Sequence, residues 1–503
     1  MNFILNQKIA KILHEKDKYL EMQNVSFKPQ AYKKAADAIA EFGKDITMVY
    51  ADGGLGALEQ IPGVGVSIAE KIEEFIKTSR VKYHEQLKKK TPIDLESLSR
   101  IGGLGLKSIA RFYQELKIKN LIDLEKAVKA GKIRTLAGFG EKSEENIKYG
   151  IDFIKKSGNR FVLGFIMPEI KLIEERLKKI KNTERVIIAG SVRRRKETIG
   201  DIDILAIAEK PKAIMDFFVS MPEVARVYVH GRTKSSVKFK NDINVDLRVV
   251  SKVSYGAALN YFTGSKEHNV ALREIALKKG YKLNEYGLFK GKTQIAGQTE
   301  DSLYKALGLK YIEPELRETR GEIESAKNNT LPDLIKYSDI KGDLQVQSDW
   351  SDGAHSIETM ARSAIECGLE YIAITDHTKR LTIANGLDET RIKKQWQEID
   401  RLNRKLKGKI KILKGTECDI LKDGSLDLSE NILAELDIVG VSVHSHFNLA
   451  ERYQTERIKR SMQNPNVDIL FHPTGRVINR RDAYEFDMEE IIGLAKKTGT
   501  VLE

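Results

Sequence analysis

The sequence predicts a multidomain protein of the α+β and α/β classes, with a helical region first, a unit on a mixed sheet next and β/α repeats last. At 503 residues the chain is several times the usual length of one domain. Helical periodicity interrupted by glycine pairs fills residues 1 to about 150, short strand patterns begin near Arg185, and strand and helix patterns alternate after Lys341. These changes of pattern predict at least three folded units in that order.

The composition indicates a soluble protein with a basic first two-thirds. No apolar run approaches the roughly 20 residues that cross a bilayer, so we expect a cytoplasmic protein with no membrane contact. The net charge is +13, yet Lys341 to Glu503 holds 24 basic and 27 acidic residues against 85 and 72 in the whole chain. The basic excess therefore lies before residue 341. It is typical of proteins that bind a phosphate backbone, although solvated lysine-rich surfaces give the same count in proteins that bind none.

Three similar glycine turns interrupt the helical region, and helix-forming sequence follows each of them. They read Pro62-Gly63-Val64-Gly65, Gly102-Gly103-Leu104-Gly105 and Ala137-Gly138-Phe139-Gly140. A helix that starts after such a turn presents free amide groups and the positive end of its dipole, which suits a backbone phosphate. A single turn of this kind is often only a glycine-terminated helix. Three copies in a basic region favour helix-hairpin-helix units that bind DNA.

The middle region contains a candidate carboxylate cluster on strand patterns. Asp201 and Asp203 are two residues apart in DIDILAIA and therefore share one face of a strand, and Asp246 lies within INVDLRVV. Three carboxylates on one sheet face repel each other unless cations neutralise them. Hard divalent cations prefer oxygen ligands, and two of them roughly 3.5–4 Å apart support nucleotidyl transfer.

A glycine-serine turn and an arginine run precede these aspartates. A D-x-D pattern alone is ordinary on a solvent-facing strand. Here Gly190 allows close backbone approach to a phosphate, Ser191 offers a hydroxyl and an amide, and Arg194 offers a planar donor to a triphosphate. The combination favours a nucleotide site.

These motifs resemble those of the family X DNA polymerases, in particular the bacterial members with a C-terminal polymerase-and-histidinol-phosphatase (PHP) domain. The sequences G-S-x-R-R, G-D-I-D from Gly200 and Y-F-T-G-S from Tyr261 occur in the family's order. The resemblance implies a nucleotidyltransferase palm in which Asp201, Asp203 and Asp246 hold Mg²⁺ or Mn²⁺. It also implies a nucleotide site and minor-groove contacts that include Tyr261, Phe262, Gly264, Asn269 and Arg273.

The same resemblance makes the first helices similar to the small domain that binds the 5′-phosphate of a gap. Lys71 matches the lysine that forms a Schiff base with deoxyribose phosphate in some relatives, and Lys28 matches a phosphate contact. A lysine does this chemistry when its pKa is lowered. Ser67 replaces a second lysine of the lyase-competent relatives, and most lysines on an amphipathic helix are plain surface.

For the C-terminal region the resemblance implies a metal cluster of a PHP domain, suited to Mn²⁺ or Zn²⁺. The matching residues are Asp352, His377, Glu417, His444 and His472. Where the family has His-x-His after the first strand, however, this chain has Gln345 and Gln347. The chain also ends at Glu503, before the final strands that supply further ligands in the family. We therefore expect an incomplete PHP domain with little nuclease activity.

The predicted domains are 1-80 (5′-phosphate and lyase-like), 81-150 (helix-hairpin-helix), 151-256 (palm), 257-317 (nucleotide selection), 318-340 (linker) and 341-503 (PHP). The predicted function is gap-filling DNA polymerisation in base-excision repair, with gapped or primed DNA and dNTPs as partners and no sign of an oligomer. Two alternatives remain: a metal-dependent 3′-5′ exonuclease or abasic-site endonuclease that acts through the PHP domain, and a DNA-binding module without catalysis.

Overall fold

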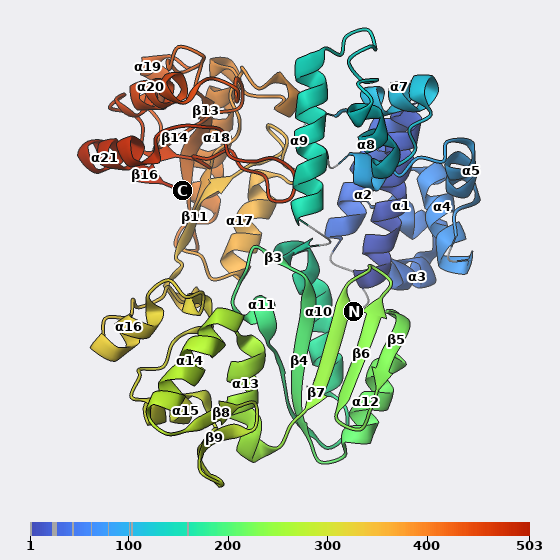
Figure 1. Cartoon of the computed structure of the whole chain (residues 1–503). Helices are drawn as coiled ribbons and strands as arrows, with labels where there is room; N and C mark the ends of the chain where they lie inside the picture. The colour runs from blue at the N-terminus through green and yellow to red at the C-terminus, as the bar shows by residue number, and fades with distance from the viewer. Residues whose placement is uncertain are drawn as a thin grey trace. The chain divides into compact units, whose positions relative to one another are not determined.

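The computed structural model describes residues 3–22, 28–42, 45–61, 63–78, 80–99, 101, 104–157 and 160–503. The chain divides into two compact units, one of residues 155–334 and one of residues 1–154 together with 335–503. Figure 1 colours the helical region blue to teal, the middle region green to yellow and the C-terminal region orange to red. Within the described ranges, no helix combines the length and the apolar character needed to span a membrane.

The N-terminal region is helical, as the periodicity predicts. Its helices are α1 (Phe3–Met22), α2 (Lys28–Glu41), α3 (Ile46–Glu59), α4 (Val66–Thr78), α5 (Lys82–Lys90), α6 (Leu95–Leu98), α7 (Leu106–Leu116), α8 (Leu121–Lys129) and α9 (Glu141–Ser157). Helices α4, α7 and α9 begin directly after Gly65, Gly105 and Gly140. The three helix starts predicted from the glycine turns are therefore confirmed.

The first part of the middle unit contains a mixed five-stranded sheet, a separate antiparallel pair of short strands, and helices. Its elements are β1 (Phe161–Val162), α10 (Leu163–Lys178), β2 (Thr183–Ile188), α11 (Gly190–Arg193), β3 (Thr198–Ile199), β4 (Asp201–Ala208), α12 (Pro211–Val219), β5 (Val224–His230), β6 (Lys234–Phe239) and β7 (Asn244–Val249). The strand order is β2-β4-β7-β6-β5, in which only the β4–β7 pair is parallel. This arrangement confirms the predicted mixed sheet.

Alternation along β4 and β7 gives the sheet two different faces. One face, with Ile202 and Leu247 among its residues, packs on α10 and α12 in the main core of the unit, and both helices lie behind the sheet in Figure 1. On the opposite face, Leu205 and Ile207 pack against the helix that follows the sheet. Asp201 and Asp203 precede Leu205 with the same period of two, so they belong to this second face.

The second part of the middle unit packs helices and a small three-stranded sheet around its own core. Its elements are α13 (Tyr255–Thr263), α14 (Lys266–Lys278), β8 (Lys282–Asn284), β9 (Gly287–Lys290), β10 (Thr293–Ala296), α15 (Glu300–Leu307) and α16 (Glu322–Asn328). Ala326 of α16 is buried in this core. Part of the segment that the sequence suggested as a linker is therefore packed structure.

The C-terminal region is a curved sheet of six parallel strands in the order β11-β12-β13-β14-β15-β16. Its strands and helices are β11 (Gly342–Val346), α17 (Ile357–Glu366), β12 (Tyr371–Ile374), α18 (Glu389–Lys405), β13 (Lys411–Asp419), α19 (Glu430–Leu433), β14 (Ile438–Ser442), α20 (Glu451–Met462), β15 (Ile469–Leu470), α21 (Met488–Thr498) and β16 (Val501–Leu502). Consecutive strands alternate with helices and stay adjacent, which confirms the predicted partial β/α barrel.

Candidate active site

The structure brings the three predicted aspartates together at one end of the mixed sheet. Asp203 of β4 and Asp246 of β7 are direct partners across the parallel pair, and Asp201 lies on the same face two residues before Asp203. Asp201 is exposed, Asp203 is half-buried, and the Asp246 side chain is 33% exposed. The cluster is therefore open to a ligand on one side.

The carboxylate of Asp203 has an environment that disfavours its negative charge. Burial and the neighbouring charges of Asp201 and Asp246 raise its pKa from 3.8 to about 7, and the cations Arg248 and Arg194 offset only part of this effect. A divalent cation would supply the missing positive charge and would accept the carboxylate oxygens as ligands. The three side chains therefore fit the metal site that their spacing predicts.

Gly190 is required by its contact with this cluster. Its φ is +61°, and a Cβ atom at this position would lie 2.6 Å from Oδ2 of Asp203. Gly190 and Ser191 form the first residues of the short helix α11, next to Asp203. The chain therefore passes close to the carboxylates only because residue 190 lacks a side chain.

Arg194 follows α11 and is held at two points. Its Nε donates to Oε1 of Glu318 at 2.8 Å, and its Nη1 donates to the carbonyl oxygen of Thr263. Gly264, with φ +71°, lies beside the guanidinium, since a Cβ there would be 3.1 Å from Nη1. The predicted nucleotide residues of two separate motifs thus meet at Arg194.

These residues line a cavity of about 460 Å³. It is lined by Arg160, Gly190, Ser191, Arg194, Gly200, Asp201, Asp203, Tyr261, Phe262, Thr263, Gly264, Lys266, Asn269 and Arg273. The sequence predicted all of them except Arg160, Thr263 and Lys266. Thr263 and Lys266 lie in and next to the Y-F-T-G-S motif, whereas nothing in the sequence around Arg160 signals a site.

The glycine turns of the helical region lie at the surface. Gly63, Gly65, Gly105, Gly138 and Gly140 are exposed, and Gly103 lies outside the described residues. A Cβ atom at Gly65, Gly105, Gly138 or Gly140 would have no neighbour within 4 Å. The turns are therefore accessible to a ligand as bulky as a DNA backbone.

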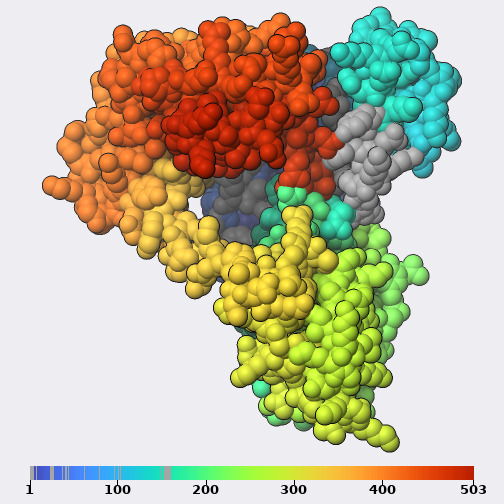
Figure 2. Space-filling view, turned by 60° about the vertical axis from the view of Figure 1, so that its left-hand side comes forward, coloured from blue at the N-terminus to red at the C-terminus, as the bar shows by residue number. Residues whose placement is uncertain are grey.

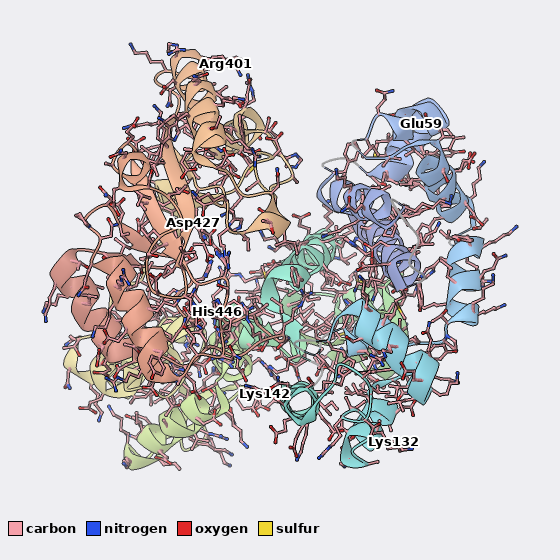
Figure 3. The ribbon with its side chains drawn as sticks, turned by 90° about the horizontal axis from the view of Figure 1, so that it is seen from above. Glu59, Lys132, Lys142, Arg401, Asp427 and His446 are labelled. Atoms are coloured by element: carbon pink, nitrogen blue, oxygen red, sulfur yellow. The ribbon has the colours of Figure 1, made fainter. Side chains whose placement is uncertain are left out.

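Lysines accompany the last of these turns. Lys132 precedes it and Lys142 stands in the first turn of α9, both are exposed, and both are labelled in Figure 3. Lys28 at the start of α2 is exposed as well. Positive charge next to open amide groups is the arrangement that phosphate binding needs.

Lys71 of α4 contacts Ser67, one turn earlier in the same helix. Its Nζ donates to the carbonyl oxygen of Ser67 at 2.5 Å and to the hydroxyl of Ser67 at 2.8 Å. Burial lowers the pKa of Lys71, the carboxylates of Glu70 and Glu74 raise it, and Lys28 lowers it. The net lowering favours the neutral amine that a nucleophile must be.

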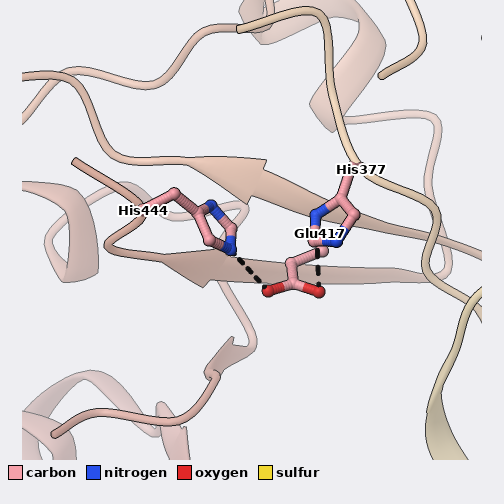
Figure 4. Close-up of side chains that lie close together, drawn as sticks. All are labelled: His377, Glu417 and His444. Atoms are coloured by element: carbon pink, nitrogen blue, oxygen red, sulfur yellow. Dashed lines mark hydrogen bonds and ion pairs between the residues drawn. The ribbon is translucent and has the colours of Figure 1, made fainter. Parts of the chain in front are cut away.

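The C-terminal region brings three of its predicted ligands, all histidines, to a fourth, Glu417. His444 Nε2 lies 3.1 Å and His472 Nε2 2.7 Å from Oε1 of Glu417, while His377 Nδ1 lies 3.7 Å from Oε2. Figure 4 shows His377 and His444 facing the two oxygens of this carboxylate. Asp352 is more remote, with a carboxylate 3.8 Å from Nε2 of His377 and half exposed. These residues line a cavity of about 850 Å³.

Gln345 and Gln347, which stand where the resemblance implies histidines, both contact Glu417. Their Nε2 atoms donate to Oε2 of Glu417 at 3.2 and 3.0 Å, and the hydroxyl of Ser442 donates to Oε1 at 2.7 Å. Burial raises the pKa of Glu417, but the hydrogen bonds from His444 and His472 outweigh burial and hold it well below its usual range. Protein donors thus already satisfy this carboxylate.

The donor set decides which metal would fit. One ligand atom from each of His377, Glu417 and His444 lies within 4.8 Å of the others, and two imidazoles with a carboxylate suit one transition-metal ion. The amide groups at 345 and 347 do not fit a further transition metal, because they point donors at the carboxylate instead of offering imidazole nitrogens. Burial lowers the pKa of His444, yet Asp419 and Glu417 outweigh burial and raise it to about 9.

Comparison with known proteins identifies three kinds of domain in this chain. Residues 4–81 match a helix-hairpin-helix domain model, residues 258–318 match the DNA polymerase beta thumb, and residues 343–495 match the PHP domain. The DNA polymerase/3'-5' exonuclease PolX of Bacillus subtilis (strain 168) is 37% identical over 98% of this chain and 86% of its own length. The DNA polymerase lambda of Rattus norvegicus is 26% identical over 62% of this chain and 56% of its own length. The chain therefore belongs to the PolX type of the family X DNA polymerases.

Proposed function

We propose that this family X DNA polymerase fills short gaps in duplex DNA, as base-excision repair requires, by adding dNTPs to a primer end. The observation that carries the proposal is the cavity in which the two aspartates of β4 meet the Gly190-Ser191 turn and the Tyr261-Phe262 pair, with Asp246 beside Asp203. A surplus of negative charge next to phosphate-binding groups suits a metal-bound triphosphate.

In this proposal each group of the cavity has a defined task. Asp201, Asp203 and Asp246 hold the ions, Mg²⁺ or Mn²⁺, which when bound activate the primer 3′-hydroxyl and stabilise the leaving pyrophosphate. Ser191 and the amide groups of the turn at Gly190 bind the triphosphate, and Arg194 binds it with its guanidinium.

The residues after the sheet select the nucleotide. Tyr261 and Phe262 border the sugar, so that a 2′-hydroxyl would be disfavoured, and Gly200 and Gly264 let the backbone approach the nucleotide. Asn269 and Arg273 border the nascent base pair. The Tyr261–Phe262 ring pair has centroids 5.1 Å apart in an edge-to-face arrangement, which gives this border a fixed shape.

In this proposal the helical region binds the DNA backbone. The turns at 62–65, 102–105 and 137–140, together with Lys28, bind backbone phosphates without reading bases. We assign 1–80 to the 5′-phosphate, 81–150 to the duplex, 151–256 to the palm, 257–317 to nucleotide selection and 341–503 to the PHP domain. We further propose a monomer that works in the cytoplasm, and a Lys71 amine that removes a 5′-deoxyribose phosphate.

A gapped duplex tests the polymerase proposal directly. A primer facing a one-nucleotide gap with a 5′-phosphate should be extended in Mg²⁺ or Mn²⁺, and extension should be faster than on an open primer-template. A 5′-deoxyribose phosphate on the same duplex, trapped with borohydride, reports on Lys71. Equal rates with and without the 5′-phosphate would contradict gap filling.

A second candidate function is 3′-5′ exonuclease activity, which the name of the Bacillus subtilis relative includes. The observation in its favour is the set of His377, Glu417 and His444, whose ligand atoms lie close enough to hold one metal ion. The two glutamines and the satisfied carboxylate weigh against it. Digestion of a labelled primer without dNTPs separates this candidate from the polymerase.

A further inference from the structure

The segment that follows the selection subdomain carries two carboxylates that reach into the polymerase unit. Glu318 accepts a hydrogen bond from Nε of Arg194 at 2.8 Å and lies 3.5 Å from Nζ of Lys196. The Arg194 and Glu318 side chains are only 14% and 22% exposed. In Figure 2, yellow atoms, the colour of the chain near residue 320, lie directly against yellow-green atoms of the preceding subdomain. Residues 318–322 are thus part of the folded unit.

Glu322, at the start of α16, is buried deeper. Its Oε1 lies 2.8 Å from Nδ1 of His268, and these two side chains are 4% and 0% exposed. The backbone N–H groups of Thr319 and Arg320 also donate to this carboxylate, at 3.1 and 2.8 Å. Burial raises the pKa of Glu322, and the bonds from His268 and the backbone outweigh it and lower the pKa. Glu322 therefore closes the 318–322 turn and anchors it to α14.

A chain of hydrogen bonds continues from His268 toward the nucleotide cavity. The hydroxyl of Tyr304 lies 2.9 Å from Nε2 of His268 and 3.0 Å from Oδ1 of Asn260. Nδ2 of Asn260 donates to Oδ1 of Asn269 at 3.3 Å, and Nδ2 of Asn269 donates to the carbonyl oxygen of Tyr261 at 2.7 Å. Asn269 and Tyr261 both line the cavity.

We propose that Glu318 and Glu322 are positioning residues of the polymerase, so that the 318–322 segment, whose sequence is typical of a linker, supports the nucleotide site. Glu318 holds the guanidinium of Arg194 where a triphosphate would meet it. Glu322 fixes the orientation of Asn269 and Tyr261 through His268, Tyr304 and Asn260. The inference rests on the roles proposed above for Arg194, Asn269 and Tyr261.

The two carboxylates should affect different steps. An arginine that has lost its partner must be ordered when the triphosphate binds, so loss of Glu318 weakens binding of every dNTP. The hydrogen-bond chain from Glu322 ends at Asn269 and Tyr261, which border the nascent base pair in the proposed function. Loss of Glu322 should therefore increase insertion of mismatched nucleotides more than it slows insertion of the correct one. Buried networks transmit such effects because each member has a restricted set of partners.

Single-nucleotide insertion into a gapped duplex by the full chain tests this inference. Glu318→Gln should raise KM for the correct dNTP about 10-fold, and Glu322→Gln should lower discrimination against a mismatched dNTP by about the same factor. The matched control is Glu324→Gln, since Glu324 is an exposed residue of α16 whose partners among the described residues are its helix neighbours Lys327 and Asn328. DNA affinity of each variant should match the control, and Tm measurements show whether each variant is folded at the assay temperature.

A second variant keeps the test decisive if Glu322→Gln does not fold. Tyr304→Phe removes only the hydroxyl between His268 and Asn260, and it should reproduce the loss of discrimination. The Tyr304→Phe, Glu322→Gln double variant should be no worse than either single variant, because both break one chain. Wild-type kinetics in Glu318→Gln together with unchanged discrimination in Tyr304→Phe would overturn the inference and leave the proposed function intact. An inactive wild-type enzyme would overturn the proposed function, and the inference with it.

Discussion

Asp203, half-buried in the polymerase unit, and Glu417, buried in the C-terminal region, are both carboxylates that the sequence marks as metal ligands, but their surroundings differ. Asp203 faces two further aspartates, and within the described chain no donor hydrogen-bonds to its side chain. Glu417 accepts hydrogen bonds from five side chains: those of Gln345, Gln347, Ser442, His444 and His472. The pKa of Asp203 is accordingly raised and that of Glu417 lowered.

The site of Asp203 therefore requires cations to balance its negative charge, whereas the carboxylate of Glu417 already has hydrogen-bond donors from the protein. A carboxylate whose pKa is raised by neighbouring carboxylates, as that of Asp203 is, gains most from a bound divalent ion, because the ion replaces donors that its own side chain lacks. A carboxylate with five donors gains less, because metal binding must first displace some of them. We therefore expect tight metal dependence at the aspartates and weak metal binding at Glu417.

The largest effect is expected at the aspartates. Asp246→Ala should reduce primer extension on the order of 10³-fold or more, because chemistry depends on the ions, while DNA affinity stays nearly unchanged because backbone contacts lie elsewhere. Extension rates and a binding titration on the same gapped duplex measure both quantities. Wild-type extension by Asp246→Ala would contradict the assignment.

The second effect concerns the metal affinity of the C-terminal site. With Asp201→Ala present so that polymerisation does not mask digestion, micromolar Mn²⁺ should produce little 3′-5′ degradation. Replacing Gln345 and Gln347 by histidine should raise Mn²⁺ affinity about 10- to 100-fold, since imidazole nitrogens replace amide donors. Calorimetric titration of Mn²⁺ measures the change.

The two outcomes of that experiment are distinct. Robust degradation by the Asp201→Ala enzyme that disappears when His377 and His444 are both changed to alanine would show that the surviving ligands suffice. Unchanged Mn²⁺ affinity after both histidine replacements would show that the donors around Glu417 are not what limits metal binding.

Burial and neighbouring like charges also disfavour a buried cation, and Lys16 of α1 is such a cation. It is fully buried, its Nζ lies 4.2 and 4.5 Å from the ring centroids of Tyr32 and Tyr83, and among the described residues its Nζ has no hydrogen-bond partner. Burial and the nearby charge of Lys71 lower its pKa from 10.5 to about 7. Between these values only the unfolded chain binds the proton, so stability rises with pH.

The expected slope is about 1.4 kcal/mol per pH unit from pH 7 upward, and it vanishes below pH 7 because both states are then protonated. Lys16→Met should remove this slope and should stabilise the helical region most at low pH. Denaturant unfolding of both proteins between pH 6 and 9 measures it. Parallel stability curves would mean that Lys16 keeps its ordinary pKa in the fold.

Sequence predicted the parts of this molecule whose chemistry is local. The period of two in DIDILAIA placed Asp201 and Asp203 on one face, and each Gly-x-Gly turn marked the start of a helix. The sequence did not predict the long-range contacts of Glu318 and Glu322, because both residues lie in a polar stretch whose composition is typical of a linker. Their partners Arg194 and His268 lie 124 and 54 residues away. Arg160 and Lys16 were missed for the same reason, since only the fold gives them their surroundings.

The smallest effect is expected at a glycine turn, which depends on neither carboxylate site. Gly105 has φ −76° and ψ 162°, a conformation that valine adopts freely, and a Cβ there meets nothing within 4 Å. Gly105→Val should therefore fold normally and weaken DNA binding a few-fold, roughly 3- to 10-fold, by keeping a phosphate from the backbone amides. The slope of log affinity against log salt should stay steep and unchanged, since no cation is removed.

Gly164→Val is the matched control, because Gly164 is also open at its Cβ but lies in α10. Equal affinity of the two variants would mean that the turn at Gly105 only begins a helix, and a shallower slope in Gly105→Val would mean that the substitution disturbed nearby lysines instead.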